Sequence, residues 1–533
     1  MSSMKKTAPR GARRRLAQAT AAEPTRHPAL DRIRGWALPG IVLVLAMSML
    51  LANLGDQRLW QDEAQTALIA GTVLTHGVPL GHDGRNSFSQ DRGDDYGRNY
   101  VWLWHPWLSF YVLAGFFAIF GKSTLVARLP FALFGVGTVL LAFQFGRLLW
   151  RSRRAGLFAA LVLLLNVPFL VLSRQCRYYA PDMFFALLGL YGYWQLLERR
   201  RFSALLFGAA AIALFHTHYV HYAALLAAAI MHAAWFRRER LRHVLLVSVV
   251  TALINAPWVL WFSSMGKMVG AQMAGGSMAI PFGLQFLEQI GKSVFSPWLV
   301  LLAAAAWAVL RSTRGRRTST DPALASKVAL LLLFIAANLV ATCFTATHPF
   351  FRFIAPLIPA ACLLTALILE SVVTIHPVGG PAVVLCVMLA LGRAWSVPDY
   401  LYEITHHYRG PVDGIVEYLG KHARKDDVVA MTYEDLPVKF YTGLRVVGGL
   451  TGEDLEPAKS ADWIIIRKYV IADKDLAVRN YLLSEVPLRE YTAIPLDAPD
   501  IPFQNREEPG EHLFRTALGD PVVILRKTGS GTR

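Results

Sequence analysis

Charged residues are scarce in this sequence. Asp, Glu, Lys and Arg together make up 17% of its 533 residues, whereas hydrophobic residues make up 54%. A soluble protein of ordinary composition contains about 25% charged residues. Runs without any charge recur at 40–54, 155–172 and 299–310. Their length and repetition exclude a chain of soluble domains and predict a polytopic α-helical membrane protein.

Cysteine is also rare. The four cysteines are Cys176, Cys343, Cys362 and Cys386, and none of them lies in the hydrophilic C-terminal region. A disulfide framework needs several cysteines in one extracytoplasmic region, and a zinc site of the Cys-x-x-Cys type needs close pairs. The sequence predicts neither.

Acidic residues are outnumbered by basic ones, 37 against 54, which gives a formal net charge of +17. A basic soluble protein of this kind would suggest a nucleic-acid partner. Here the Lys and Arg residues gather in short loops between apolar segments, as the positive-inside rule describes for membrane proteins. No module of interleaved basic and aromatic residues accompanies them, so nucleic-acid binding is not predicted.

The basic loops orient the predicted helices. Residues 1–37 form a basic segment that is interpreted as a disordered cytoplasmic tail, so the first helix, at about 38–54, runs outward. Arg-rich clusters follow apolar segments that end near 149, 197, 236 and 310, and strict alternation of spans places each cluster on the cytoplasmic side. This predicts a transmembrane domain over 38–397 with about eleven spans.

Two regions then lie on the extracytoplasmic side. The first outer loop contains an apolar segment, 105–120, which is too short to span a bilayer and is expected to form an embedded or interfacial helix. The C-terminal region, 398–533, is expected to form an extracytoplasmic α/β domain. Its predicted elements are a helix at 411–423, a strand at 428–432, a short helix near 436–442, and strands at 445–448, 463–467 and 521–526.

Two adjacent carboxylates, Asp62 and Glu63, follow the first helix on the outer side. Carboxylates at a membrane exit can supply a general base and a partner, or ligands for a divalent metal. A solvated acidic pair at the end of a helix is the alternative.

Two arginines, Arg174 and Arg177, lie on the outer side and so break the charge rule that the other Arg-rich loops obey. Guanidinium groups make charge-assisted contacts with phosphate, so a lipid phosphate would explain the exception. Snorkelling toward lipid head groups is the alternative. Asp182 begins the next helix and could pair with either arginine or face the reacting centre.

Histidines gather on the same outer face. His216, His218 and His221 could bind a metal, although a turn at the membrane interface is the other reading of this cluster. His105 opens the short apolar segment of the first outer loop, and Arg352 follows a His-Pro pair.

The order of these motifs resembles a known family. It runs from Asp62-Glu63 through His105-Pro106 and Ala127-Arg128-Leu129-Pro130 to 173–177 and Asp182. In this order the chain resembles the GT-C superfamily, in the branch of the dolichyl-phosphate-mannose protein mannosyltransferases and bacterial lipid A aminoarabinose transferases. The similarity is strongest over 38–240, and the C-terminal region matches in position and general character.

The resemblance implies an inverting glycosyltransferase of the bacterial inner membrane. Its expected partners are a polyprenyl-phosphate sugar donor, membrane lipids and an envelope acceptor. Asp62 would act at the acceptor, with Glu63 supporting it or holding a divalent ion, and Asp182 would be the acid of the second loop. Three arginines would handle the donor phosphate: Arg174, Arg177 and Arg352. Three further residues would bind substrate: His105, Tyr178 and His218. The second loop lacks an acidic-x-acidic pair, which leaves metal dependence open.

Two other functions fit the same topology. A transporter or flippase for a polyprenyl-linked sugar would use the same groove and arginines without chemistry, but such proteins often have internal repeats and broken helices at the midplane. No repeat is evident here. A scaffold for envelope assembly would use the C-terminal domain for binding, and it would leave Asp62 and the outer arginines unexplained.

Overall fold

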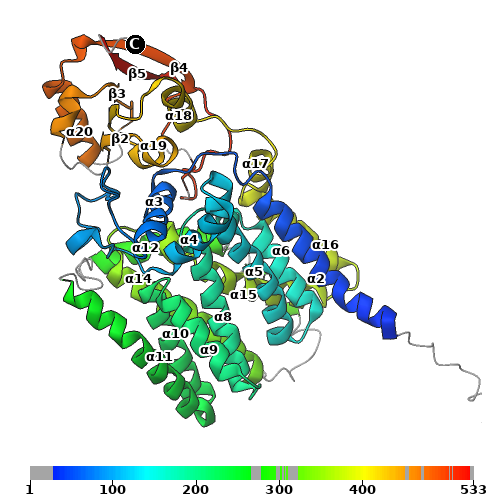
Figure 1. The fold of residues 1–533 in the computed structure, drawn as a ribbon. Coiled ribbons are helices and arrows are strands. Elements are labelled where there is room, and N and C mark those ends of the chain that lie inside the picture. The colour runs from blue at the N-terminus through cyan, green and yellow to red at the C-terminus, as the bar shows by residue number, and fades with distance from the viewer. Residues whose placement is uncertain are drawn as a thin grey trace, which may run out of the picture.

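The computed structural model describes residues 28–265, 278–295, 322–449, 455–469, 473–502 and 505–528 except 507, with a few isolated positions between 301 and 309. A bundle of helices forms most of the molecule, and a small domain with a sheet lies at one end of it (Figure 1). The predicted span that ends near 310 falls largely outside the described residues.

The described residues 28–265 form ten α-helices: α2 (Pro28–Leu51), α3 (Gln61–His76), α4 (Leu108–Phe120), α5 (Thr124–Trp150), α6 (Arg153–Leu165), α7 (Val167–Arg174), α8 (Tyr179–Leu197), α9 (Ser203–Phe215), α10 (Tyr219–Phe236) and α11 (Arg238–Ser264). Further along the described chain come α12 (Ala279–Gln289), η3 (Ile290–Val294), α14 (Pro322–Thr345), η5 (Phe351–Ile354), α15 (Leu357–Val373), α16 (Gly379–Ala394) and α17 (Val397–Glu403). Helix α2 begins at Pro28, so it extends into the segment predicted to be a tail.

Four described helices are long and apolar enough to cross a membrane, namely α5, α10, α11 and α14. The number rises to six if each of two bent helix pairs forms one span, and four shorter apolar helices accompany them. The polytopic helical architecture therefore agrees with the sequence, while the count of about eleven spans stays a prediction.

The uncharged run 155–172, which the sequence suggests as one span, forms a broken helix. Helices α6 and α7 meet at Asn166 with a bend of 69°. The side chain of Asn166 accepts a hydrogen bond from the Phe169 N–H, which caps α7, and Pro168 occupies the first turn of α7. Pro is favoured at a helix start and Asn is a strong N-cap, so this pair begins a new helix instead of continuing the old one. A similar bend of 57° separates α16 from α17.

The first outer loop is an ordered layer between the bundle and the sheet domain. Helix α4 has 13 residues, which agrees with the short embedded helix predicted there. Helix α3 lies beside it and packs against α19 (Asp435–Thr442) of the sheet domain (Figure 1). Two buried bonds fix this contact, because Gln61 Nε2 donates to Asp435 Oδ1 (2.9 Å) and Gln61 Oε1 accepts from the Leu436 N–H (3.4 Å). The first residue of α3 is therefore held against the start of α19.

The sheet domain contains five strands in the order β2-β1-β3-β5-β4. Its elements are α18 (Pro411–His422), β1 (Val428–Met431), α19, β2 (Arg445–Gly448), η6 (Glu456–Ser460), β3 (Trp463–Ile465), α20 (Asp473–Glu485), η7 (Leu488–Glu490), β4 (Tyr491–Pro499) and β5 (Pro521–Lys527). Strands β2, β1 and β3 are parallel, whereas β5 pairs antiparallel with both of its neighbours, β3 and β4. The predicted α/β domain is present, with β4 and α20 as elements that the sequence patterns did not indicate.

Candidate active site

Asp62 lies in the first turn of α3 and is almost completely buried, with 8% of its surface exposed. Its Oδ2 faces two guanidinium groups, Arg177 Nη2 at 3.4 Å and Arg352 Nη1 at 3.7 Å. Its Oδ1 accepts a hydrogen bond from Gln90 Nε2 at 2.9 Å. The two arginines come from segments far apart in the chain, and they meet at one carboxylate.

These neighbours decide the charge of Asp62. Burial by itself would raise the pKa of a carboxyl group, but Arg177, Arg352 and the Gln90 hydrogen bond together bring the pKa of Asp62 below its usual range. The nearby His105 behaves in the opposite way, because burial and then Arg177 bring its pKa well below the usual histidine value. At neutral pH the site therefore contains an ionised carboxylate beside a neutral imidazole.

Arg177 is held rigidly in this site. Its Nη1 donates to the Asp62 carbonyl oxygen (3.1 Å) and to Thr66 Oγ1 (3.1 Å), so it is fixed to the first turns of α3. Its guanidinium lies over the ring of Tyr178, at 5.7 Å from the ring centre. Among the described residues its buried Nε has no hydrogen-bond partner. One N–H of a fixed, buried guanidinium thus remains available for an acceptor from a ligand.

A row of aromatic and histidine rings continues from Arg177. The ring of Tyr178 lies 5.4 Å from that of His105 and 5.5 Å from that of His218, and His218 stacks on His221 at 3.8 Å. The three residues predicted to bind substrate, His105, Tyr178 and His218, are therefore brought together beside Asp62 and its arginines. Their roles stay predictions.

Asp182 belongs to the far end of this row. It is fully buried on α8, and its Oδ2 lies 2.7 Å from His221 Nδ1. His221 Nε2 in turn lies 3.1 Å from the carbonyl oxygen of Phe353, the residue after Arg352. The structure thus pairs Asp182 with His221, a member of the histidine cluster considered for metal binding, and links both to the short helix η5 that carries Arg352.

Glu63 has a different environment from its neighbour Asp62. It forms a buried ion pair with Arg128, whose Nε donates to Oε1 (2.8 Å) and whose Nη2 donates to Oε2 (2.7 Å). Three more donors reach the same carboxylate, namely the N–H groups of Trp60 and Cys176 and the Asn505 amide. A carboxylate has about four lone-pair positions, so these five donors saturate it. Glu63 is placed to hold α3, α5 and the 175–177 turn together.

This geometry corrects the idea that Asp62 and Glu63 could share a divalent metal. Asp62 faces two cations, and the oxygens of Glu63 are occupied. The histidine cluster does not suit a metal either, because His218 and His221 stack with their rings 13° from parallel and so do not converge on a point. In the part of the chain that the structure describes, no group of three or more His, Cys, Asp or Glu residues could hold a metal ion.

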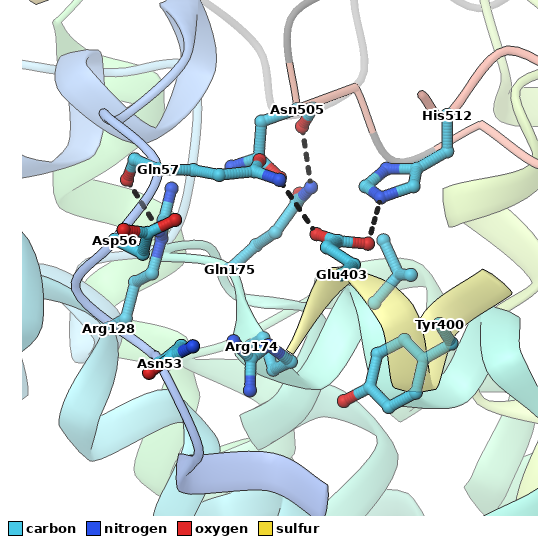
Figure 2. Close-up of a pocket in the computed structure, with 11 residues that line it drawn as sticks. Asn53, Asp56, Gln57, Arg128, Arg174, Gln175, Tyr400, Glu403, Asn505 and His512 are labelled. Atoms are coloured by element: carbon cyan, nitrogen blue, oxygen red, sulfur yellow. Dashed lines mark hydrogen bonds and ion pairs between the residues drawn. The ribbon is translucent and has the colours of Figure 1, made fainter. Parts of the chain in front are cut away.

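Arg174 does not join Arg177 and Arg352 at Asp62. Its Nη1 donates to the carbonyl oxygens of Ala52 (2.8 Å) and Leu50 (3.1 Å) at the end of α2. It faces a separate small polar cavity of about 20 Å³, which is shown in Figure 2. Arg174 is therefore placed to cap α2, and its contact with the donor phosphate stays a prediction.

Replacing Glu63 with Gln should destabilise the protein. The substitution removes the charge that compensates the buried Arg128 guanidinium, and breaking a buried pair on one side costs about 3–5 kcal/mol. Thermal unfolding of the purified protein in one detergent measures the effect, with Glu288→Gln as the control. Glu288 pairs with Lys292 on an exposed surface, so its loss should not shift the midpoint. Equal midpoints for the two variants would contradict the structural role of Glu63.

Comparisons with known proteins bear on this arrangement. Residues 104–261 match a family described as dolichyl-phosphate-mannose-protein mannosyltransferase. The structure aligns with that of ArnT from Cupriavidus metallidurans bound to undecaprenyl phosphate, with a TM-score of 0.57, 15% identity, and coverage of 94% of this chain and 99% of that one. The fold is that of an ArnT-like GT-C protein. The apo ArnT structure gives a TM-score of 0.56 at the same identity, with coverage of 94% of this chain and all of the other.

The resemblance to the GT-C superfamily is thus confirmed in both sequence and fold. A curated relative, undecaprenyl phosphate-alpha-4-amino-4-deoxy-L-arabinose arabinosyl transferase 1 of Pseudomonas fluorescens, is 28% identical over 255 residues. The match covers 44% of this chain and 42% of that protein, which is less than half of its length. The segment matched to the mannosyltransferase family contains His105, Arg177 and Asp182, while Asp62 and Arg352 lie outside it.

Proposed function

We propose that the chain is an inverting glycosyltransferase that moves a sugar from a polyprenyl-phosphate donor to an envelope acceptor. The observation that carries this proposal is an ionised, buried Asp62 held between Arg177 and Arg352. The ArnT-like fold supports a polyprenyl-phosphate donor, and the name of the curated relative points to an aminopentose as the sugar. Lipid A is the acceptor to test first, before other envelope lipids, polysaccharides and proteins.

The proposed reaction is a single displacement. Asp62 takes the proton of the acceptor hydroxyl while the oxygen of that hydroxyl attacks the anomeric carbon of the donor sugar. The bond from that carbon to the phosphate oxygen breaks, and the polyprenyl phosphate leaves with the electron pair. Arg177 and Arg352 stabilise the negative charge that develops on the leaving group.

The same arginines account for activation of the base. Without donor, the positive charges of Arg177 and Arg352 stabilise the Asp62 carboxylate and lower its pKa, which makes Asp62 a weak base. A donor phosphate that draws both guanidinium groups toward its own oxygens weakens their hold on Asp62, and the pKa of Asp62 rises. The carboxylate then becomes a better proton acceptor when the donor is in place.

The proposed activity can be measured with purified protein in proteoliposomes. We expect undecaprenyl-phosphate 4-amino-4-deoxy-L-arabinose to be consumed when lipid A is present, with free undecaprenyl phosphate and modified lipid A detected by mass spectrometry. Donor that crosses the bilayer unchanged would instead indicate the transporter. No consumption with this donor or with other polyprenyl-phosphate sugars would overturn the proposal.

We further propose that the N-terminus is cytoplasmic and that the sheet domain and the site lie on the extracytoplasmic face. The positive-inside distribution of basic loops supports this orientation. An exposed residue of the sheet domain, Asp426, offers a test through an Asp426→Cys substitution in a variant without the four native cysteines. An impermeant maleimide should label this cysteine in intact spheroplasts. Labelling only after lysis would reverse the assigned side.

A further inference from the structure

A segment of the C-terminal domain reaches the candidate active site. Strands β4 and β5 are joined by a long connection, and two described residues of its 505–512 segment contact distant elements: Asn505 contacts the first outer loop and Glu508 contacts η5. This segment is more than 440 residues from Asp62 in the sequence, because Asn505 and Glu63 are 442 positions apart. Its contacts fall on the neighbours of Asp62 and Arg352.

Asn505 contacts the Asp62 side. It is buried, and its Nδ2 donates to Glu63 Oε2 at 3.0 Å. Its carbonyl oxygen accepts from Gln175 Nε2 at 3.1 Å, two residues before Arg177. One residue of the C-terminal domain therefore ties the start of α3 to the turn that carries Arg177.

Glu508 contacts the Arg352 side. Its buried Oε2 accepts a hydrogen bond from the Phe351 N–H at 3.0 Å. Phe351 is the first residue of η5, and Arg352 follows it. A carboxylate that accepts from a helix-start N–H is also favoured by the backbone dipole. Glu508 thus fixes the position from which Arg352 approaches Asp62.

The far end of the segment is anchored as well. His512 Nε2 lies 2.8 Å from Glu403 Oε2, and His512 Nδ1 lies 2.6 Å from the carbonyl oxygen of Arg506. Figure 2 shows His512 and Gln57 pointing toward the two oxygens of Glu403, and Gln57 Nε2 donates to Oε1 at 2.9 Å. The segment is therefore tied to α17 and to the residues after α2.

We propose that Asn505 and Glu508 are positioning residues that set the separation between Asp62 and Arg352. The inference rests on the proposed function, and it means that the C-terminal domain helps to position the residues of the candidate active site. Asp62 and Arg352 sit on separate segments with 3.7 Å between their charged atoms, and the 505–512 segment contacts the residue next to each of them. A shift of η5 would move Arg352 away from both Asp62 and the donor phosphate.

The kinetic test uses a series at one position. Glu508→Ala removes the acceptor for the Phe351 N–H, so we expect kcat to fall and the donor KM to rise, each about tenfold, with an unchanged acceptor KM. Glu508→Gln retains an oxygen at the same place and should restore most of the activity. The matched control is Glu511→Gln, because Glu511 is on the same segment and pairs with Arg506. A role in stability alone would lower all activities together, with no split between the two KM values and no rescue by Gln.

Hydrogen exchange separates this inference from the proposed function. The amide of Phe351 should exchange faster in Glu508→Ala than in the wild type or in Glu511→Gln, and this measurement needs no sugar donor. Faster exchange in Glu508→Ala, together with a wild type that transfers no sugar, would refute the proposed function while the contact between Glu508 and Phe351 stands. An active wild type together with unchanged kinetics in Glu508→Ala and in Asn505→Ala would overturn the positioning role.

Discussion

Asp62→Asn is expected to reduce sugar transfer by about 10²–10⁴-fold, the contribution of a positioned general base. The amide has nearly the same shape as the carboxylate, so packing around α3 is retained. It cannot accept the proton of the acceptor hydroxyl, and it presents no charge to Arg177 and Arg352. The measurement is kcat in proteoliposomes with saturating donor and acceptor.

The matched control for this substitution is Asp426→Asn, which changes an exposed carboxylate of the sheet domain. Both variants should purify as folded protein with similar gel-filtration profiles. Asp62→Asn should also bind undecaprenyl phosphate at least as well as the wild type, because the two arginines lose a competing anion. A variant that transfers sugar at the wild-type rate would remove Asp62 as the base.

The sequence predicted that Asp62, Arg177 and Arg352 lie on one side of the membrane, because the spans alternate between the basic loops. It did not predict that both arginines meet at the Asp62 carboxylate, nor the surroundings of each residue within a cluster. Successive residues on a helix point about 100° apart, so Asp62 and Glu63 enter different surroundings although both are carboxylates. Arg174 ends α7 and Arg177 follows in the next turn, and a difference of three residues there sends one guanidinium to α2 and the other to α3.

Contacts between distant segments explain the other residues that sequence reasoning missed. Gln90 and Glu508 belong to loops without a recognisable motif. Gln90 reaches Asp62 through the folding of the first outer loop, and Glu508 reaches Phe351 through the packing of the C-terminal domain on the bundle. Arg128 was visible as part of a motif, but its pairing with Glu63 depends on how α5 approaches α3. Asn166 and Pro168 form a pattern typical of a helix start, but they stand inside a continuous apolar run, so the run indicates one span and not the break between α6 and α7.

In the sheet domain, too, the sequence indicates some strands and not others. Buried strands such as β1 and β3 are short apolar runs, so periodicity and turn residues indicate them. Strand β4 contains Pro495 and Pro499 and alternates weakly between buried and exposed positions. It lies at the edge of the sheet, where proline is tolerated, so its pairing with β5 defines it more than its own pattern does.

Arg177→Ala and Arg174→Ala form a pair that separates the two arginines of one segment. Arg177→Ala should raise the donor KM and lower kcat, with a combined loss in kcat/KM of about 10²–10³-fold, as for removal of one donor to a developing anion. The reason is that Arg177 faces Asp62, and its Nε has no acceptor among the described residues. The acceptor KM should stay close to that of the wild type.

Arg174→Ala should behave differently, because Arg174 donates to backbone carbonyl oxygens at the end of α2. We expect a lower thermal midpoint and a donor KM within about threefold of the wild type, since no contact with the donor is lost and buried carbonyl groups lose one donor. Binding of undecaprenyl phosphate, measured with both purified variants in one detergent, gives the comparison. If Arg174→Ala weakens phosphate binding as much as Arg177→Ala does, the donor phosphate lies between the two arginines and the site must be placed closer to the cavity of Figure 2.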